Sequence, residues 1–147
     1  VMSPARFLLK DVELLNQGCT VTHYRPYLLN TELAAIEYLR KHAKLDDVVL
    51  APPDVALFIP ALAGMRVYYG HWSETPDYVG KLAEYVQFAR EIESGTYNPA
   101  VPSIAKASYL VGYGDGFADA IPADDPNVDE VYANDDVVIW RSGYTSD

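Results

Sequence analysis

Apolar residues recur every three or four positions in the segment that follows Asn30, which is the spacing of one helical face. The repeating residues are Leu33, Ile36, Leu39 and Ala43. Asn30 or Thr31 can cap the first turn, and Glu32 places a negative charge at the positive end of the helix dipole. Basic residues 40–42 suit the last turn. The sequence therefore predicts a helix over residues 31–43.

A longer apolar stripe follows Thr75 and Pro76. It consists of Tyr78, Leu82, Tyr85, Val86, Ala89 and Ile92, which share one face of a 3.6-residue period. We expect Thr75 to be the N-cap and Pro76 to occupy the first helical position, where a missing N–H costs nothing.

Shorter helical patterns occupy residues 5–15 and 54–58. In the first of these, one side carries Phe7, Leu8, Val12 and Leu15. Gly18 follows, where the end of a helix favours glycine. In the second, we expect Asp54 to cap the first turn and Pro60 to end the helix.

Three short runs at residues 48–51, 66–69 and 107–113 are typical of strands. The first is continuously apolar, as in a parallel strand that is buried on both faces. In the second, Tyr68 and Tyr69 point to opposite faces, so at least one is expected in the core. Residues 129–133 and 137–141 flank Asn134, Asp135 and Asp136, which predicts a β-hairpin.

Strands that alternate with helices indicate an α/β fold. Because such crossovers are right-handed, we expect a three-layer, Rossmann-like parallel sheet flanked by helices and ending in an antiparallel β-hairpin. Residues 28–147 fit a single domain, whose size is commonly ~100–150 residues. Residues 1–27 are expected to be a lead-in segment.

The charge and the cysteine and histidine content of the chain exclude several kinds of binding partner. The net charge of −10 argues against nucleic acid and against docking on anionic lipid through charge, since both need clustered Lys and Arg. Cys19 is the only cysteine and the three histidines are scattered, so we expect no metal site. Residues 112–116 lack the full glycine spacing of a nucleotide-binding loop, so we expect no cofactor.

The candidate chemistry lies in the loops that follow the predicted parallel strands, because ligands of open α/β sheets bind there. Asp54, His71 and Glu74 lie in two of these loops, and Tyr113 begins a third. The first three side chains could support acid–base chemistry. Each also has a structural interpretation: Asp54 as an N-cap, Glu74 beside a helix start, and His71 as a loop residue bonded to backbone.

Trp72 adds an aromatic side chain to the same loop, which raises the stacking of a sugar as a further option. We expect the nearby tyrosines to pack in the core. The ligand-binding candidates are therefore Asp54, His71, Trp72, Glu74 and Tyr113. None of them is assigned as a catalytic residue.

Several runs of the sequence resemble a family of bacterial membrane proteins. The most specific run is Gly70-His-Trp-Ser-Glu-Thr-Pro-Asp-Tyr78 with Lys81. It is accompanied by residues 31–43, 47–51, 58–61, 64–68, 109–111, 131–132 and 137–140. Together these look like the C-terminal soluble domain of polytopic proteins similar to mannosyltransferase-like, lipid-phosphosugar-dependent glycosyltransferases. The likeness covers roughly residues 28–141.

The resemblance implies a domain on the extracytoplasmic face of the bacterial cell membrane, anchored through transmembrane helices that are not in this sequence. It implies that the catalytic acidic residue of the parent enzyme lies in a loop between membrane helices, which nothing here matches. The implied partners are the membrane-embedded remainder of the protein and a glycan or lipid-linked sugar.

We therefore expect a non-catalytic accessory domain that positions an acceptor or a lipid-linked sugar. Two alternatives remain open from the residues. One is a free-standing hydrolase-like enzyme that uses an Asp54, His71 and Glu74 cleft. The other is a structural or protein-interaction module.

Overall fold

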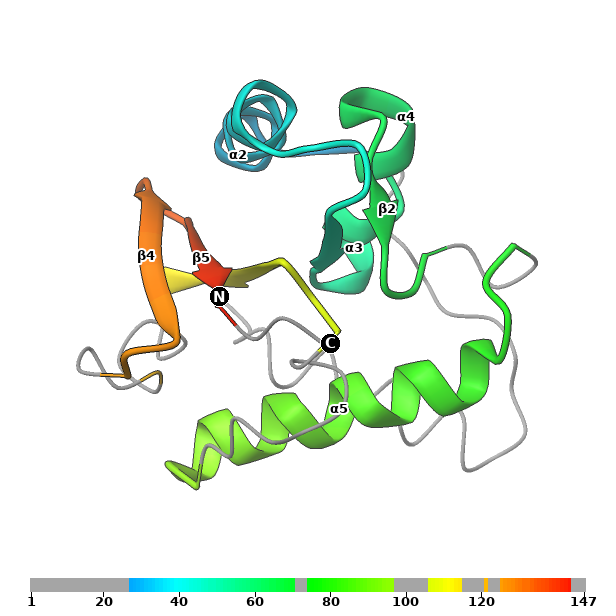
Figure 1. Cartoon of the computed structure of the whole chain (residues 1–147), viewed down its shortest axis with the longest axis vertical. Coiled ribbons are helices and arrows are strands. Elements are labelled where there is room, and N and C mark those ends of the chain that lie inside the picture. The colour runs from blue at the N-terminus through cyan, green and yellow to red at the C-terminus, as the bar shows by residue number, and fades with distance from the viewer. Residues whose placement is uncertain (1–26, 71–73, 97–105, 115–120, 122–124, 144–147) are drawn as a thin grey trace.

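A computed structural model of the chain describes residues 27–70, 74–96, 106–114, 121 and 125–143 (Figure 1). Its elements in chain order are α2 (Asn30–His42), β1 (Val48–Leu50), α3 (Pro53–Ala56), α4 (Ile59–Ala63), β2 (Arg66–Val67), α5 (Tyr78–Ser94), β3 (Tyr109–Tyr113), β4 (Val128–Ala133) and β5 (Val137–Ser142). The predicted helix at residues 5–15 and the lead-in lie outside the described residues. No helix among those described is long and apolar enough to cross a membrane.

The five strands form one open mixed sheet in the order β2-β1-β3-β5-β4. β1 pairs in parallel with β2 on one side and with β3 on the other, where Leu50 lies opposite Leu110. β5 runs antiparallel to both β3 and β4. The α/β class and the terminal antiparallel hairpin are thus confirmed. The parallel arrangement holds only for β2, β1 and β3, because the hairpin supplies the other two strands.

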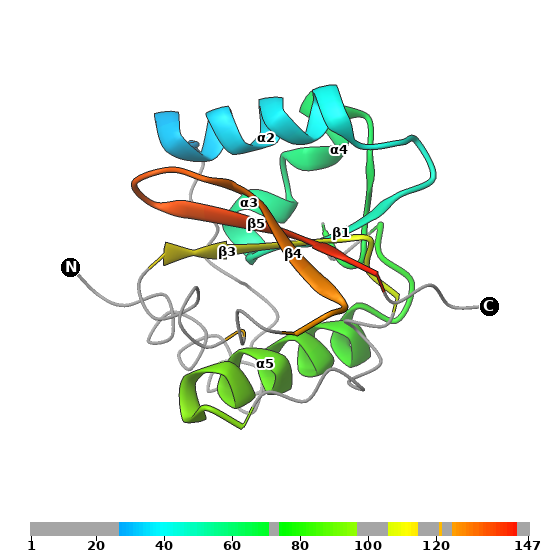
Figure 2. The same cartoon turned by 60° about the vertical axis from the view of Figure 1, so that its left-hand side comes forward.

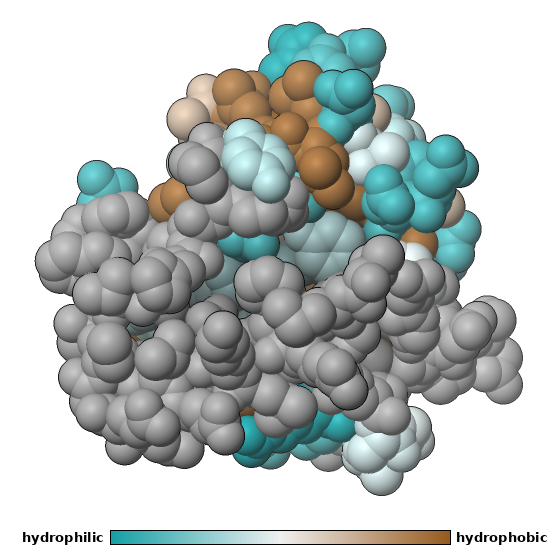
Figure 3. Space-filling view, turned by 180° about the vertical axis from the view of Figure 1, so that it is seen from behind, coloured by the Kyte–Doolittle hydropathy of each residue, from teal (hydrophilic) through white to brown (hydrophobic). Residues whose placement is uncertain are grey.

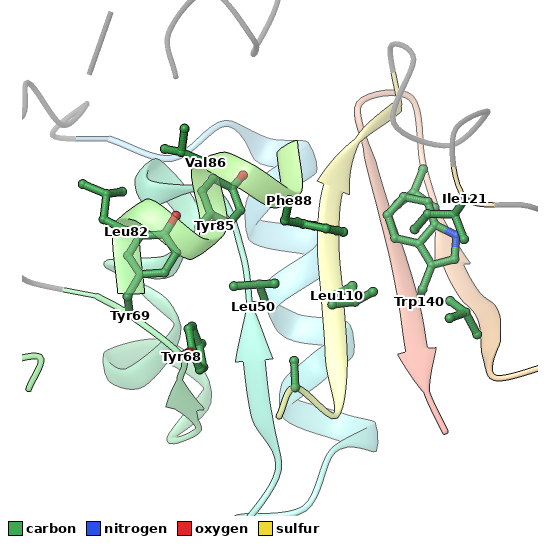
Figure 4. Close-up of a cluster of buried hydrophobic side chains, with 13 residues drawn as sticks. Leu50, Tyr68, Tyr69, Leu82, Tyr85, Val86, Phe88, Leu110, Ile121 and Trp140 are labelled. Carbon is green, nitrogen blue, oxygen red and sulfur yellow. The ribbon is translucent and has the colours of Figure 1, made fainter. Parts of the chain in front are cut away.

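Buried side chains gather on both faces of the sheet. On one face, Leu50, Leu110 and Trp140 pack with residues of α5 (Figure 4). On the other face, Val49, Val111 and Ile139 pack with residues of α2, α3 and α4. Figure 2 shows α2 and α5 on opposite sides of the strands. Alternate residues of one strand therefore serve two separate helical coverings.

The hairpin turn is fixed by Asn134, as the sequence predicts. Its Oδ1 accepts hydrogen bonds from the backbone N–H groups of Asp136 and Val137, at 3.1 and 2.9 Å. The backbone N–H of Asn134 donates to the carbonyl of Val137, which closes the turn. An asparagine side chain that bonds the backbone a few residues ahead stabilises such turns.

The start of α2 differs from the prediction. Neither Asn30 nor Thr31 caps it, because both already belong to the helix and the cap position is Leu29. The backbone N–H of Leu29 donates to Glu32 Oε2 at 2.8 Å. Glu32 therefore satisfies the helix start from inside the first turn, as the acidic residue of a capping box does.

Two other predicted helix boundaries were also wrong. Pro60 does not end a helix but lies in the first turn of α4, where proline is tolerated. α4 ends at Ala63 and is capped by Gly64, whose positive φ lies in the left-handed region that glycine adopts without strain. Thr75 does not cap α5, which begins at Tyr78. Its hydroxyl accepts a hydrogen bond from the backbone N–H of Gly70 at 3.0 Å.

The apolar stripe of α5 is confirmed for the residues whose burial is described. Leu82, Tyr85 and Val86 are buried, and Tyr78 is partly buried against the same cluster. Phe88 is also buried in this cluster, although the predicted stripe did not include it. Tyr68 and Tyr69 are both buried and both belong to this core, so the expectation that at least one would be is met.

Leu82→Ala tests the packing of α5 on the sheet. Leu82 is completely buried. Truncation should therefore lower the free energy of unfolding by about 2–5 kcal/mol. Val79 lies on the exposed side of the same helix. Val79→Ala should change the free energy of unfolding by about 0.5 kcal/mol at most, as is usual for surface positions. Urea denaturation followed by circular dichroism measures both, and equal effects at the two positions would mean that α5 is not held against the core.

Candidate functional site

The carboxyl ends of β1 and β3 form the edge of the sheet where the sequence placed the candidate residues. The two strands are parallel neighbours, and their paired residues include Leu50 and Leu110. After β1 the chain passes through α3 and α4 to β2, on one side of β1. After β3 it continues to the hairpin on the opposite side. Connections that diverge in this way mark the position where open α/β sheets bind ligands.

Asp54 lies at this edge, as the second residue of α3, and is half-buried. The N-cap interpretation was wrong, because Pro52 holds the cap position and α3 has no side-chain cap. Its charge reaches Tyr85 of α5. Burial raises the pKa of the Tyr85 phenol, and the Asp54 carboxylate raises it further because it opposes a second negative charge. Asp54 is therefore close enough to α5 to affect the chemistry of its side chains.

Three tyrosines line the side of this edge that α5 covers. The rings of Tyr69 and Tyr85 lie 5.1 Å apart (Figure 4), and that of Tyr78 lies 6.4 Å from Tyr69. The Tyr69 hydroxyl donates to the carbonyl of Ala51, just beyond β1, at 2.9 Å. The expectation that the tyrosines near Trp72 belong to the core is confirmed for Tyr68 and Tyr69, which are 6 and 1 % exposed.

Tyr113 lies on the other face of the sheet. Its hydroxyl donates to Glu32 Oε1 at 2.7 Å, and its ring packs against the cluster beneath α2. Glu32 is completely buried, and its other oxygen accepts the N–H of Leu29. The carboxylate thus joins the start of α2 to the end of β3. Tyr113 and Asp54 lie at the ends of adjacent strands, and Tyr113 faces α2.

Sequence reasoning missed Glu32 as a partner of Tyr113. The local signal was an acidic residue three positions after the residue that precedes the helix, which is the capping-box spacing. The expectation of a helix-dipole role for Glu32 accounts for its place in the first turn. Its bond to Tyr113 spans 81 residues, and no local pattern encodes that separation.

The hairpin tip is held to the same end of α2. The Thr31 hydroxyl donates to Asp136 Oδ2 at 2.7 Å. Asn134 Nδ2 donates to the carbonyl of Thr31 at 2.9 Å and to the Tyr132 hydroxyl at 3.1 Å. These bonds and the pair of Glu32 and Tyr113 fix the position from which the chain leaves β3.

The loop after β2 carries the remaining candidates. His71 and Trp72 lie outside the described residues, while Glu74 is exposed. Gly70, at the start of the loop, is buried, and a Cβ added there would lie 3.0 Å from a methyl group of Val67. The close approach and the bond from Gly70 to Thr75 hold the base of this loop against β2.

A second polar cluster lies where β2 ends and α5 begins, and sequence reasoning missed it. The Tyr68 hydroxyl donates to Glu84 Oε2, and Lys81 Nζ lies 5.3 Å from the centre of the Tyr68 ring. Burial, the Glu84 bond and the charge of Asp77 raise the pKa of Tyr68. Asp77 has a positive φ, which is uncommon outside glycine. Within the described residues, no group of three or more His, Cys, Asp or Glu side chains could hold a metal ion.

The bond between Tyr113 and Glu32 can be tested by removing one hydroxyl. Tyr113→Phe should lower the free energy of unfolding by about 1.5–3 kcal/mol, because a buried carboxylate loses a hydrogen-bond donor. Tyr132→Phe removes a neutral bond to Asn134. Its cost should be smaller, on the order of 1 kcal/mol, as for a neutral hydrogen bond. Urea denaturation at neutral pH gives both values. If Tyr113→Phe left the free energy of unfolding unchanged, this bond would not contribute to holding α2 in place.

The buried phenols predict a loss of stability at alkaline pH. Their folded-state pKa lies above the unfolded value of 10.0, so the stabilisation is complete below pH 10 and is lost as the pH rises further. Above pH ~10, each such group lowers the free energy of unfolding by about 1.4 kcal/mol per pH unit. In Tyr85→Phe, the free energy of unfolding should fall less steeply above pH ~10, by that amount per pH unit. Its dependence on pH below pH ~9 should be unchanged. An unaltered alkaline slope would contradict the burial of this phenol.

A scan against protein-family models found no match, and searches of curated proteins and of solved structures found no match either.

Proposed function

We propose that this chain is an extracytoplasmic accessory domain of a membrane glycosyltransferase-like protein. In this role it positions an acceptor or a lipid-linked sugar and does not catalyse the transfer alone. Its partners are the membrane-embedded remainder of the parent protein and the bound sugar. As part of this proposal, the fold is a reduced Rossmann-like arrangement, in which helices flank a sheet that contains three parallel strands.

One observation carries the proposal: the sheet brings three loops to one edge. Asp54 follows β1, the loop from Gly70 follows β2, and Tyr113 ends β3. Since β2, β1 and β3 are adjacent parallel strands, their carboxyl ends meet at that edge. The loop from Gly70 to Tyr78 is also the most specific part of the family resemblance. A ligand site would therefore coincide with the segment by which the chain resembles the family.

The described polar groups at this edge favour positioning over catalysis. Tyr113 and Glu32 bond to one another, and Thr75 accepts the N–H of Gly70. The Tyr69 hydroxyl donates to a backbone carbonyl. Groups held in such bonds give a rigid base for the loops, whereas a general acid or base must be within reach of a substrate proton. The loops themselves carry further aromatic and acidic side chains that can meet a ligand.

Titration of the chain with sugars tests this role. The ligands are short mannose oligosaccharides and a mannosyl phosphate with a short isoprenoid chain. We expect saturable amide shifts in the NMR spectrum at Gly70, Glu74 and Gly114, with no turnover of the ligand. Tryptophan fluorescence should also respond. Trp140 is 3 % exposed in the core, so the response should come from Trp72 and disappear in Trp72→Phe.

The matched control is Asp129→Asn, at an exposed position of the edge strand β4, which should leave the shifts unchanged. Three results would reject the positioning role. Turnover that is lost in Asp54→Asn and Glu74→Gln would indicate a free-standing hydrolase. An absence of any response, with His71→Ala and Trp72→Ala each costing more than ~2 kcal/mol of stability, would indicate a structural module. Shifts that persist in Trp72→Ala would place the sugar elsewhere.

A further inference from the structure

A cluster of polar side chains lies where the loop from Gly70 to Tyr78 leaves β2 and enters α5. Tyr68 follows β2 directly, and Lys81 and Glu84 lie in the first two turns of α5. The Tyr68 hydroxyl donates to Glu84 Oε2, and Lys81 Nζ lies 5.3 Å from the centre of the Tyr68 ring. We call these three residues the α5 cluster. It therefore flanks the loop that carries part of the proposed sugar site.

The charged side chains of the α5 cluster do not form the ion pairs that their spacing favours. Oppositely charged side chains three or four positions apart commonly pair on a helix. On α2, Glu37 pairs in this way with Lys41, four positions later, at 3.6 Å. Asp77 precedes Lys81 by four positions and Glu84 follows it by three. In the described part of the chain, no ion pair joins Lys81 to either carboxylate.

Tyr68 holds Lys81 and Glu84 apart. Its hydroxyl occupies one oxygen of Glu84, and its ring lies under the Lys81 ammonium group at the distance of a cation–π contact. Tyr68 is buried in the core on the α5 side of the sheet (Figure 4), so this support is rigid. Lys81 and Glu84 are half-buried. Lys81 Nζ and Glu84 Oε1 are thus left without a hydrogen-bond partner among the described residues.

These two groups match a ligand that donates and accepts hydrogen bonds at neighbouring atoms. The carboxylate of Glu84 only accepts, and the ammonium group of Lys81 only donates. A hydroxyl group can do both, so two adjacent hydroxyls of a sugar can bind the two side chains at once. Hydrogen bonds that involve a charged group are roughly twice as strong as neutral ones.

The surroundings of the cluster favour a polar, uncharged part of a ligand. Figure 3 shows hydrophilic residues along the bottom of the molecule, where α5 runs in Figure 1, and hydrophobic residues gathered at the top. Burial and Glu84 raise the pKa of Tyr68, and the exposed Asp77 carboxylate raises it further, so Asp77 lies near the cluster. Its charge and the net charge of −10 disfavour a phosphate here. A neutral sugar ring is therefore the better match.

We propose that Lys81 and Glu84 bind two adjacent hydroxyl groups of the sugar that this domain positions. Lys81 donates to the oxygen of one hydroxyl, and Glu84 accepts from the other. Both are positioning residues and take no part in a reaction. This inference rests on the function proposed above, to which it adds the residues that select the sugar.

Titration of the full chain with methyl α-mannoside, followed by NMR, tests this assignment. Lys81→Met and Glu84→Gln should each raise the dissociation constant about 10-fold or more, because each removes a charged hydrogen-bonding group. Glutamine keeps an oxygen that accepts from Tyr68, so the fold should be retained. The matched control is Arg90→Met, which removes a charge from an exposed position of α5 and should leave the dissociation constant unchanged.

Mannosides that each lack one hydroxyl separate a direct contact from a structural effect. In the unchanged chain, loss of either of two adjacent hydroxyls should weaken binding about 10-fold. In Lys81→Met or Glu84→Gln, loss of the corresponding hydroxyl should have no further effect.

Two results would overturn this inference and leave the proposed function standing. One is a mannoside that binds the unchanged chain and both variants equally well. The other is weaker binding in both variants with the full penalty retained for every missing hydroxyl. An unchanged chain that binds no sugar would overturn the proposed function and this inference together.

Discussion

The parallel pairing of β1 with two neighbours is the constraint on which the other elements depend. Val49 and Leu50 are almost fully buried and point to opposite faces of the sheet. A strand that is buried in this way needs an apolar covering on each side. α5 supplies one covering, and α2 with α3 and α4 supplies the other. The chain must therefore leave β1 toward one side and return across to β3, and this divergence creates the edge that carries the candidate loops.

The second constraint is the fastening of α2 to the antiparallel half of the sheet. Glu32 holds the end of β3 through Tyr113, and Thr31 holds the hairpin tip through Asp136. A buried carboxylate is costly unless hydrogen bonds satisfy it, and here two described donors do so. One residue thus completes a helix start and fixes the direction of a strand end. The position of the loop after Tyr113 depends on this pair.

Sequence patterns predicted the elements better than their boundaries. Periodicity depends on burial, so the stripe of α5, the continuous strand β1 and the hairpin around Asn134 were all recognisable. Boundaries depend on which group satisfies each backbone N–H, and several candidates compete within a few residues. Thr75 was expected to cap α5, but its hydroxyl accepts the N–H of Gly70 instead. Pro60 can end a helix or begin one, and tertiary packing chose the second.

The sequence predicted which loops form the candidate site but not the partners of the side chains in it. Alternating strands and helices predict parallel strands, whose carboxyl ends share one edge of the sheet, so the sequence could bring Asp54 and Tyr113 to that edge. It could not tell which face each side chain meets, because that depends on distant partners. Tyr113 meets Glu32 across 81 positions, and the phenol of Tyr85 senses the charge of Asp54 from a different element.

The hydrogen bonds at this edge of the sheet hold the scaffold together, and the loops that leave it have a different role. Tyr69, Tyr113 and Glu32 make bonds that hold strands and helices in place. Rigid elements with such bonds position loops well, and loops on a rigid scaffold carry a large share of the binding residues in proteins. The Tyr113 hydroxyl, for example, donates to a carboxylate that also serves a helix start. In the proposed function, this edge presents a sugar and the chemistry of the transfer takes place in the membrane-embedded partner.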